Sequence, residues 1–314
     1  MRHRRARLAK RIPAMISTLQ KTVLLLLSGV VALPLAKPDA PDIRTVNPDL
    51  TVPKLSRSPA APGRRIKQTL PGYEQTKVYH VTYLPTDWEE GKRYPVIIEY
   101  AGNHYNGAFG DISTGRPEGS NMGYGISGGR GFIWICLPYL NAAGDDIALT
   151  WWGDSKKRTA KPTLDYCLKA VPWICQQYGG DPGQVILCGF SRGAIACNYL
   201  GLYDDRMAKL WRTFISYSHY DGIAAWPYPG SDRDSALGRL KRLAKRPQFI
   251  SHEVTGSRLN LTATKRWLKS TGQTENMTFA ETGFRNHNDA WLLRPSAARD
   301  QLRRWLKGVL AQKH

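Results

Sequence analysis

The segment 189–193 (GFSRG) is the strongest chemical signal in the chain. An apolar run of strand type (QVILC) precedes it, and a run of helical type (AIACNYL) follows it. Between a buried strand and a helix, G-x-S-x-G forms a sharp turn whose glycines let the serine hydroxyl project over the sheet. The helix N-terminus beneath that hydroxyl favours developing negative charge. This context predicts that Ser191 is a nucleophile, which needs a nearby base to take its proton.

The elements that must position Ser191 alternate between strand and helix. Short apolar runs predict strands at 78–83, 94–100, 131–138, 184–188, 212–218, 247–254 and 277–282. Apolar residues at helical spacing predict helices at 161–178, 191–202, 235–245, 261–269 and 295–312. The Gly-rich stretch 124–131 is expected to be a loop. This alternation predicts an α/β fold, with a mostly parallel sheet flanked by helices in one domain over 73–314.

The order of strand, G-x-S-x-G turn, helix and late histidine resembles the α/β-hydrolase superfamily over roughly residues 76–312. By its layout, the chain looks like secreted esterases of the polyhydroxybutyrate-depolymerase and feruloyl-esterase type. The superfamily resemblance implies a base in the loop between the last strand and the C-terminal helix. His287 lies in that loop, 283–291 (GFRNHNDAW), and imidazole titrates near neutrality. We therefore predict that His287 is the base.

The carboxylate that would orient His287 has two candidates. The resemblance places the acid after the strand at 247–254, where the aligned position is Gly256, and Glu253 stands earlier. Some family members carry the acid after the preceding strand, where Asp221 lies in a turn at the same sheet edge. We favour Asp221 over Glu253, and a structural Asp-Gly turn is the alternative for Asp221.

The resemblance also implies an oxyanion hole of two backbone N–H groups. One belongs to Arg192, and the other comes from Gly102 or Asn103 in the loop after the strand 94–100. Arg192 directly follows the nucleophile, as in glucuronoyl esterases, whose arginine helps to stabilise the oxyanion. Gly193 keeps that motif's spacing, whereas its neighbours differ. The alternative is that the Arg192 side chain pairs with a local carboxylate to hold the helix.

Aromatic and polar residues near the expected active-site edge are candidates for binding the substrate. They are Trp151 and Trp152 in the loop 141–154, together with Arg192, His219 and Trp291. The tryptophans suit a sugar or a phenolic ring, although we expect at least one of Trp151 and Trp152 to pack beneath its loop. No zinc-ligand spacing, P-loop or dinucleotide-binding glycine pattern is present, so we expect no cofactor and no metal.

The N-terminal region predicts export. Residues 23–36 are apolar, and fourteen residues suit a signal-peptide core better than a membrane span. We expect a signal peptide over 1–36, with Met15 as an alternative start and an uncleaved anchor as the alternative reading. A linker rich in Pro, Ser and basic residues follows over 37–72. The five cysteines are expected to be buried thiols, with one disulfide as the alternative. The expected location is secreted or periplasmic, with no stable membrane span after signal cleavage.

The formal charge is +20, and loss of the seven Lys and Arg in 1–36 would leave +13. Such a charge favours anionic partners, here an acidic polysaccharide, whereas no motif indicates specific nucleic-acid binding. We predict a serine esterase that cleaves carbohydrate or aromatic esters through an acyl-enzyme. A serine peptidase on the same fold and a non-catalytic, basic carbohydrate- or surface-binding module are the alternatives. The ester itself and the oligomeric state do not follow from the sequence.

Overall fold

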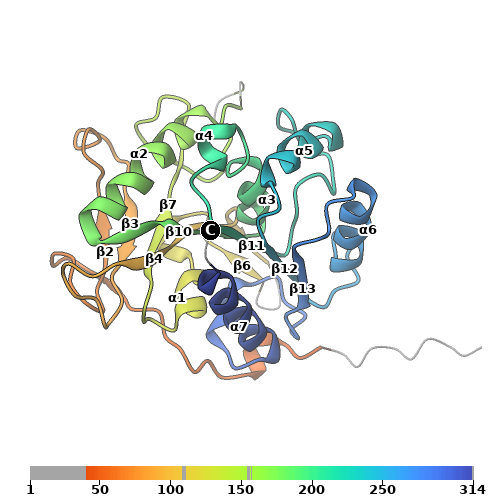
Figure 1. The fold of residues 1–314 in the computed structure, drawn as a ribbon, viewed down its shortest axis with the longest axis horizontal. Helices are drawn as coiled ribbons and strands as arrows, with labels where there is room; N and C mark the ends of the chain where they lie inside the picture. Colours follow the sequence, from red (N-terminus) through yellow and green to blue (C-terminus); the bar gives the residue numbers. More distant parts are fainter. Residues whose placement is uncertain (1–39, 108–110, 154–155, 157, 313–314) are drawn as a thin grey trace, which may run out of the picture. The chain divides into compact units, whose positions relative to one another are not determined.

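A nine-stranded sheet forms the centre of the part of the chain that the structure describes (Figure 1). The structure is a computed structural model that describes residues 40–107, 111–153, 156 and 158–312, so the predicted export signal lies outside it. Every strand runs in one direction except β3, which is antiparallel to both of its neighbours. The strand order is β1 (Leu55–Ser56), β2 (Arg65–Gln68), β3 (His80–Tyr83), β7 (Ile133–Leu137), β4 (Tyr94–Tyr100), β10 (Gly180–Phe190), β11 (Thr213–Tyr217), β12 (Gln248–His252) and β13 (Met277–Glu281).

Helices cover both faces of this sheet (Figure 1). On one face lie α2 (Lys161–Tyr178), α3 (Arg192–Tyr199), α4 (Asp205–Ala208), α5 (Arg233–Leu240) and α6 (Leu261–Thr271). On the other face lie α1 (Met122–Ser127) and α7 (Ala297–Ala311). This arrangement confirms the predicted α/β architecture with a mostly parallel sheet.

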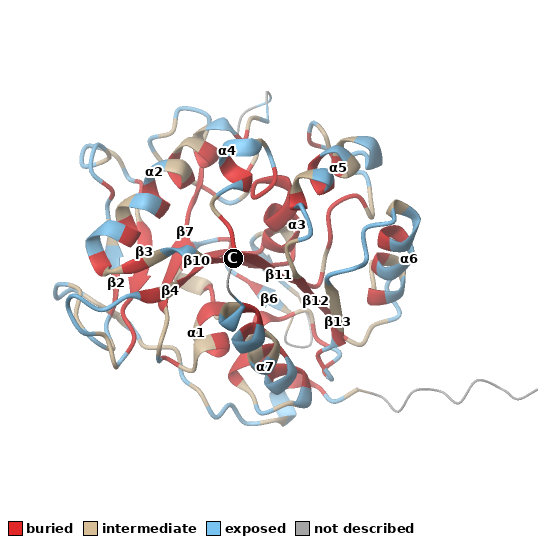
Figure 2. Cartoon of the chain, in the orientation of Figure 1, coloured by how far each residue is buried: buried red, intermediate tan, exposed pale blue. Residues whose placement is uncertain are grey.

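The central strands are buried on both faces, as the continuous apolar runs predicted (Figure 2). Alternate residues of β4 point to opposite sides: Val96 and Ile98 join the core beneath α2 and α3, and Ile97 joins the core beneath α1 and α7. In β10, Leu187 joins the core beneath α2 and α3, and Ile186 joins the core beneath α1 and α7. The strand β10, which leads to Ser191, is therefore packed on both sides.

The segment 37–72, predicted as a linker, is instead part of the fold over its described residues 40–72. A one-turn helix η1 (Ile43–Thr45) and the strands β1 and β2 lie within it. Ile43 and Leu70 are buried, and Arg299 pairs with Asp49. Apolar residues are sparse in this segment, so its sequence has the composition of a linker although Ile43, Ile66 and Leu70 are buried.

The Gly-rich stretch 124–131, predicted as a loop, contains most of α1 and is corrected accordingly. Gly125 lies so close to Leu292 that a Cβ there would overlap it, and Gly128 ends the helix with a φ of 64°. Two of the glycines that suggested a loop therefore serve close packing and helix termination.

Two short hairpins and short helical turns complete the described residues. The hairpins pair β5 (Tyr105–Asn106) with β6 (Ile112–Ser113) and β8 (Tyr139–Leu140) with β9 (Ile147–Ala148). The remaining turns are η3 (Pro117–Gly119), η4 (Lys241–Leu243) and η5 (Asp289–Leu293). All five cysteines are buried free thiols, as expected. Among the described residues, no helix combines the length and apolar character that crossing a membrane requires.

Candidate active site

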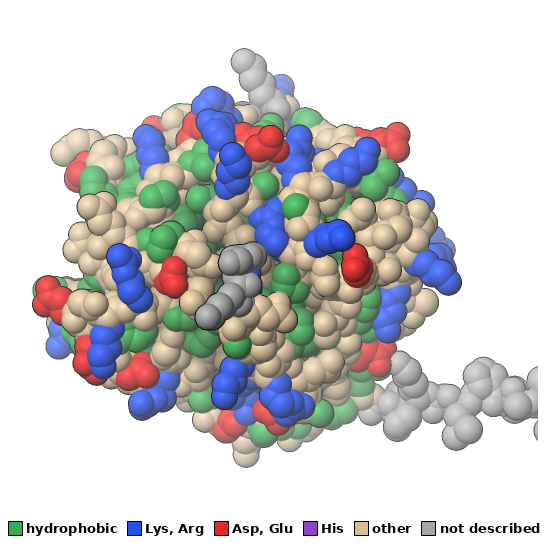
Figure 3. All heavy atoms as spheres, in the orientation of Figure 1, with side chains coloured by type: hydrophobic (Ala, Val, Ile, Leu, Met, Phe, Trp, Pro, Cys, Tyr) green, Lys and Arg blue, Asp and Glu red, His purple; other side chains and the backbone are tan. Residues whose placement is uncertain are grey.

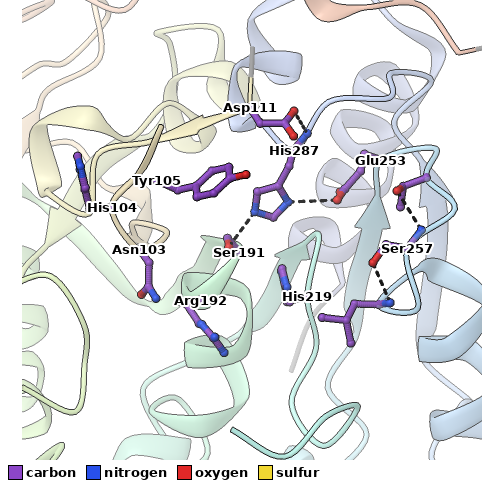
Figure 4. A pocket seen from close by; sticks show the side chains of 12 residues that line it. Asn103, His104, Tyr105, Asp111, Ser191, Arg192, His219, Glu253, Ser257 and His287 are labelled. Atoms are coloured by element: carbon purple, nitrogen blue, oxygen red, sulfur yellow. Dashed lines mark hydrogen bonds and ion pairs between the residues drawn. The ribbon is translucent and has the colours of Figure 1, made fainter. Parts of the chain in front are cut away.

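Ser191 stands in a strained turn between β10 and α3. Its backbone has φ 55° and ψ −116°, a conformation that a residue with a side chain adopts only at a cost. Its N–H donates to the Tyr217 carbonyl of β11 at 2.9 Å, and its carbonyl accepts from Ala194 in the first turn of α3. Both neighbouring elements thus hold the turn predicted from GFSRG, and the Ser191 hydroxyl is directed into a pocket (Figure 4).

His287 reaches Ser191 from the loop between β13 and η5. Its Nε2 lies 2.9 Å from Ser191 Oγ, which is the geometry predicted for this pair. The backbone N–H of His287 donates to the Asp111 carboxylate at 2.9 Å. The Phe190 ring packs against the imidazole, with 4.6 Å between ring centres. The imidazole is therefore held by its backbone as well as by its ring.

The preference for Asp221 as the carboxylate beside His287 is wrong in this geometry. Glu253 Oε1 lies 3.1 Å from His287 Nδ1, and the Glu253 side chain is buried. Asp221 instead forms a buried, bidentate ion pair with Arg239 of α5 at 2.8 and 3.0 Å. Strand β12 ends at His252, so Glu253 is the first residue beyond its carboxyl end. The predicted strand boundary at residue 254 had placed Glu253 inside the strand.

Ser218, which was not among the predicted site residues, lies between the side chains of His287 and Glu253. Its Oγ is 2.7 Å from His287 Nδ1 and donates to Glu253 Oε1 at 3.0 Å. Ser218 is fully buried and has a φ of 81°, in the region that favours glycine. Its place directly after β11, next to the nucleophile strand at the carboxyl edge of the sheet, was the signal that could have identified it.

The loop after β4 approaches Ser191 closely. A Cβ on Gly102 would lie 3.1 Å from Ser191 Cβ and 2.7 Å from Ser113 Oγ, so only glycine fits there without a shift. Asn103 follows it and lines the pocket. Arg192 supplies the first N–H of α3. The predicted oxyanion-hole residues are therefore all gathered around Ser191.

The pocket above Ser191 has a volume of about 400 Å³. Its lining comes from the loop after β4, the start of α3 and the segments that follow β11, β12 and β13. The lining residues are Asn103, His104, Tyr105, Asp111, Ser191, Arg192, His219, Glu253, Thr255, Ser257, Leu259 and His287. Among these described residues, Arg192 is the sole Lys or Arg. The site thus combines a serine–imidazole–carboxylate array with one fixed positive charge.

His219 lines the pocket as predicted and lies edge-on to His287, with 5.3 Å between ring centres. Burial lowers the pKa of His219 well below its ordinary value, and the nearby His287 and Arg192 charges act in the same direction. A neutral His219 therefore adds no positive charge next to the His287 ring.

The predicted aromatic residues have different positions. Trp152 is half-buried near Arg192. Trp151 is fully buried beneath it and packs against Tyr199 and Tyr228, so the expectation that at least one of the pair lies under the loop is confirmed. Trp291 is also fully buried, in the core beneath α1 and α7. The substrate-binding predictions for Trp151 and Trp291 are therefore wrong, because neither lines the pocket.

Comparisons with known proteins bear on the fold. No protein-family model matches the chain, and no curated protein matches its sequence. An S-formylglutathione hydrolase from Agrobacterium tumefaciens is 15% identical with a TM-score of 0.54, over 79% of this chain and 95% of that one. A putative dipeptidyl aminopeptidase IV from Bacteroides ovatus (14%, 0.53) and oligopeptidase B from Leishmania major (13%, 0.50) each match over 78% of this chain.

This chain spans only 35% and 37% of the lengths of those two peptidases. At such identities the likeness concerns the fold, and together with the strand order and the turn at Ser191 it defines the α/β-hydrolase fold. The narrower resemblance to polyhydroxybutyrate depolymerases and feruloyl esterases stays a prediction.

Proposed function

We propose that this chain is a serine hydrolase that cleaves carboxylic esters through an acyl-enzyme intermediate. The observation that carries the proposal is the continuous array from Ser191 Oγ through His287 to Glu253, at 2.9 and 3.1 Å. A strained nucleophile turn, a histidine and a buried carboxylate in this order activate a hydroxyl that is otherwise unreactive.

In the proposed reaction, Ser191 Oγ bonds to the ester carbonyl carbon while its proton passes to His287 Nε2. The carbon–oxygen bond to the alcohol then breaks, and the alcohol leaves with the proton from His287. Water repeats these steps on the acyl-enzyme and releases the acid, so one ester and one water give one acid and one alcohol. The N–H of Arg192 and that of Gly102 or Asn103 would hold the carbonyl oxygen as it becomes negative.

Carbohydrate or aromatic esters are the proposed substrates. Their support is Tyr105, an aromatic residue that lines the pocket and is half exposed, since such rings stack on sugars and phenols. We further propose that the protein acts outside the cytoplasm, as a secreted or periplasmic enzyme, on the basis of the apolar segment 23–36.

Labelling with a fluorophosphonate probe tests the proposal. Label should map to Ser191 in the wild-type protein and be absent from Ser191→Ala, which should also lose hydrolysis of a panel of acetyl, feruloyl, glucuronoyl and nitrophenyl esters. A peptide nitroanilide in the same panel tests the peptidase alternative. Label on another residue, or unchanged hydrolysis by Ser191→Ala, would contradict the proposal.

A further inference from the structure

The buried arginines of this chain generally have partners within the described residues. Arg239 pairs with Asp221, and Arg299 pairs with Asp49. Arg212, for which no carboxylate partner is found among the residues described, donates to the carbonyl oxygens of Val309 and Gln312. These contacts offset the cost of removing a guanidinium from water.

Arg192 differs from them. Within the described residues its guanidinium makes no ion pair and no hydrogen bond, and its Nη1 is buried. The alternative interpretation, in which Arg192 pairs with a local carboxylate, is therefore wrong for this part of the chain. Burial lowers the pKa of Arg192 from its ordinary value, although a guanidinium still carries its charge at neutral pH.

Aromatic rings hold this guanidinium in place. Its central carbon lies 3.4 Å from the centre of the Trp226 ring and 5.8 Å from that of Trp152. Contacts with ring faces stabilise the cation but leave the N–H groups at its edge free to donate. Tyr228 stacks on Trp152 at 4.8 Å, and its buried hydroxyl also has no hydrogen-bond partner among the described residues. The aromatic cluster thus contains two buried polar atoms, Arg192 Nη1 and the Tyr228 hydroxyl, without a hydrogen-bond partner among the described residues.

The acids that line the pocket have other partners. Glu253 contacts His287 and Ser218, and Asp111 accepts from the His287 backbone. Neither of these two carboxylates forms an ion pair with Arg192. A fork of N–H donors fixed against rings, beside a nucleophile and without a protein anion, is suited to a carboxylate supplied by the ligand.

The position of Arg192 indicates which half of an ester would carry that carboxylate. In Figure 4, the Arg192 and His287 side chains lie on opposite sides of Ser191. The alcohol must leave on the side of His287, because His287 gives it a proton. The group that reaches Arg192 therefore belongs to the acyl part.

We propose that Arg192, with Trp152 and Trp226, forms a subsite for a carboxylate in the acyl part of the substrate. The inference rests on the proposed function, and it narrows the substrate class to monoesters of dicarboxylic acids and related acidic acyl groups.

Matched pairs of small esters test the subsite. Monoethyl succinate, glutarate and adipate are each compared with the ethyl ester whose far carboxylate is replaced by a carboxamide. For at least one chain length, kcat/KM should be about tenfold to a hundredfold higher for the carboxylate, because a charge-assisted hydrogen bond is stronger than a neutral one. Arg192→Met should bring that ratio close to one, and Arg192→Lys should give an intermediate ratio.

Arg304→Met is the matched control, because this substitution removes the same charge as Arg192→Met. Arg304 is an exposed residue of α7, on the face of the sheet opposite to α3. A wild-type ratio of one or less at every chain length would overturn the proposal. Equal falls in the ratio for Arg192→Met and Arg304→Met would also overturn it, since the effect would then be one of net charge.

Binding of glutarate to Ser191→Ala, followed by tryptophan fluorescence and calorimetry, separates the subsite from the catalytic proposal. Binding that is lost in the double variant Ser191→Ala/Arg192→Met supports the subsite even if no ester proves to be a substrate. Equal glutarate binding by the single and double variants overturns the subsite and leaves the proposed hydrolase activity to its own labelling test.

Discussion

Proton placement around His287 decides which side chains can act together. For Nε2 to take the proton of Ser191, Nδ1 must already carry one, and Nδ1 then donates toward Ser218 Oγ and Glu253 Oε1. The Ser218 hydroxyl can accept that bond through a lone pair while it donates its own proton to Glu253, 3.0 Å away. All three contacts are thus compatible with a single tautomer, the one that general-base catalysis needs.

The two acidic candidates should respond differently to amide substitution. Glu253→Gln would present an amide beside His287 Nδ1, and we expect kcat to fall by about three to four orders of magnitude, as expected when a triad acid is lost. Asp221→Asn would leave Arg239 without its anion, and we expect a loss of stability of about 3 kcal/mol or more.

Steady-state kinetics and denaturant unfolding of both variants check this pair. For Asp221→Asn, kcat per folded molecule should fall much less than for Glu253→Gln. A larger fall in kcat for the folded Asp221→Asn protein would restore Asp221 as the orienting acid.

Ser218 should matter for turnover rather than for folding. Ser218→Gly removes the hydroxyl while glycine adopts a φ of 81° without strain, so stability should be maintained. We expect kcat to fall by about tenfold to a hundredfold with little change in KM, since the imidazole loses an orienting contact. Proton NMR should show a changed signal for the His287 Nδ1 proton. Unchanged kcat and an unchanged signal would show that Ser218 fills space only.

At the scale of elements, predictability follows the length and continuity of apolar runs. The strand at 94–100 and the helix at 161–178 were predicted at their observed bounds, because each is a long run with a single period. Strand β2 was missed because it contains one apolar residue, Ile66, among polar ones. Strand β2 is stabilised by its antiparallel pairing with β3, and the local sequence does not indicate this pairing.

The same reasoning applies to the site. Ser191 and His287 were identified because each lies in a segment with a distinctive context. The choice between Glu253 and Asp221 depended on a strand end placed two residues too late, and strand ends are the least certain feature of such predictions. Ser218 contacts His287 through a backbone bend with a φ of 81°, which the sequence pattern does not indicate.

Glu99 of β4 provides an element-scale prediction. It is fully buried and accepts from the N–H groups of Met122 and Gly123 at the start of α1 and from Trp134 Nε1. Burial, aided by the Asp289 charge, raises the pKa of Glu99 from 4.5 to about 7. The folded state therefore binds this proton more tightly than the unfolded state. The resulting stabilisation is present below about pH 4.5 and is lost as the pH rises through about 7.

Glu99→Gln should remove that part of the pH dependence. It should also destabilise the fold by about 1–3 kcal/mol at neutral pH, since an amide places a donor against donors. Denaturant unfolding from about pH 4.5 to about pH 7.5 measures both effects. Glu90→Gln, at an exposed carboxylate, is the control. An equal slope of unfolding free energy against pH in wild type and Glu99→Gln would contradict the prediction.

At the scale of the whole molecule, positive charge is spread widely over the surface, as the blue side chains in Figure 3 show for one face. Arg233, Arg258 and Arg266 line a groove of about 540 Å³, and Leu259 lines both this groove and the pocket at Ser191. Basic residues therefore extend from the neighbourhood of the nucleophile toward α6.

Salt should weaken activity on an acidic polymer more than activity on a small neutral ester, because screening affects only the charged substrate. Comparing kcat/KM for the two substrates over a range of sodium chloride concentrations measures this difference. Substitution of Arg233, Arg258 and Arg266 by Met should reduce the salt dependence for the polymer. Equal salt dependence for both substrates would exclude a role of the surface charge.

The residues just before the first strand also touch the loop that carries His287. The Ile43 N–H donates to the Asn286 side chain at 2.6 Å, and Asp42 pairs with Arg285 at 3.0 Å. Any proteolytic maturation that cuts between Ile43 and β1 would spare every residue of the proposed triad and yet remove these two contacts to the loop. A recombinant enzyme that starts at residue 50 should therefore fold around the same sheet but turn over slowly, and the boundary chosen for expression becomes a variable of the assay.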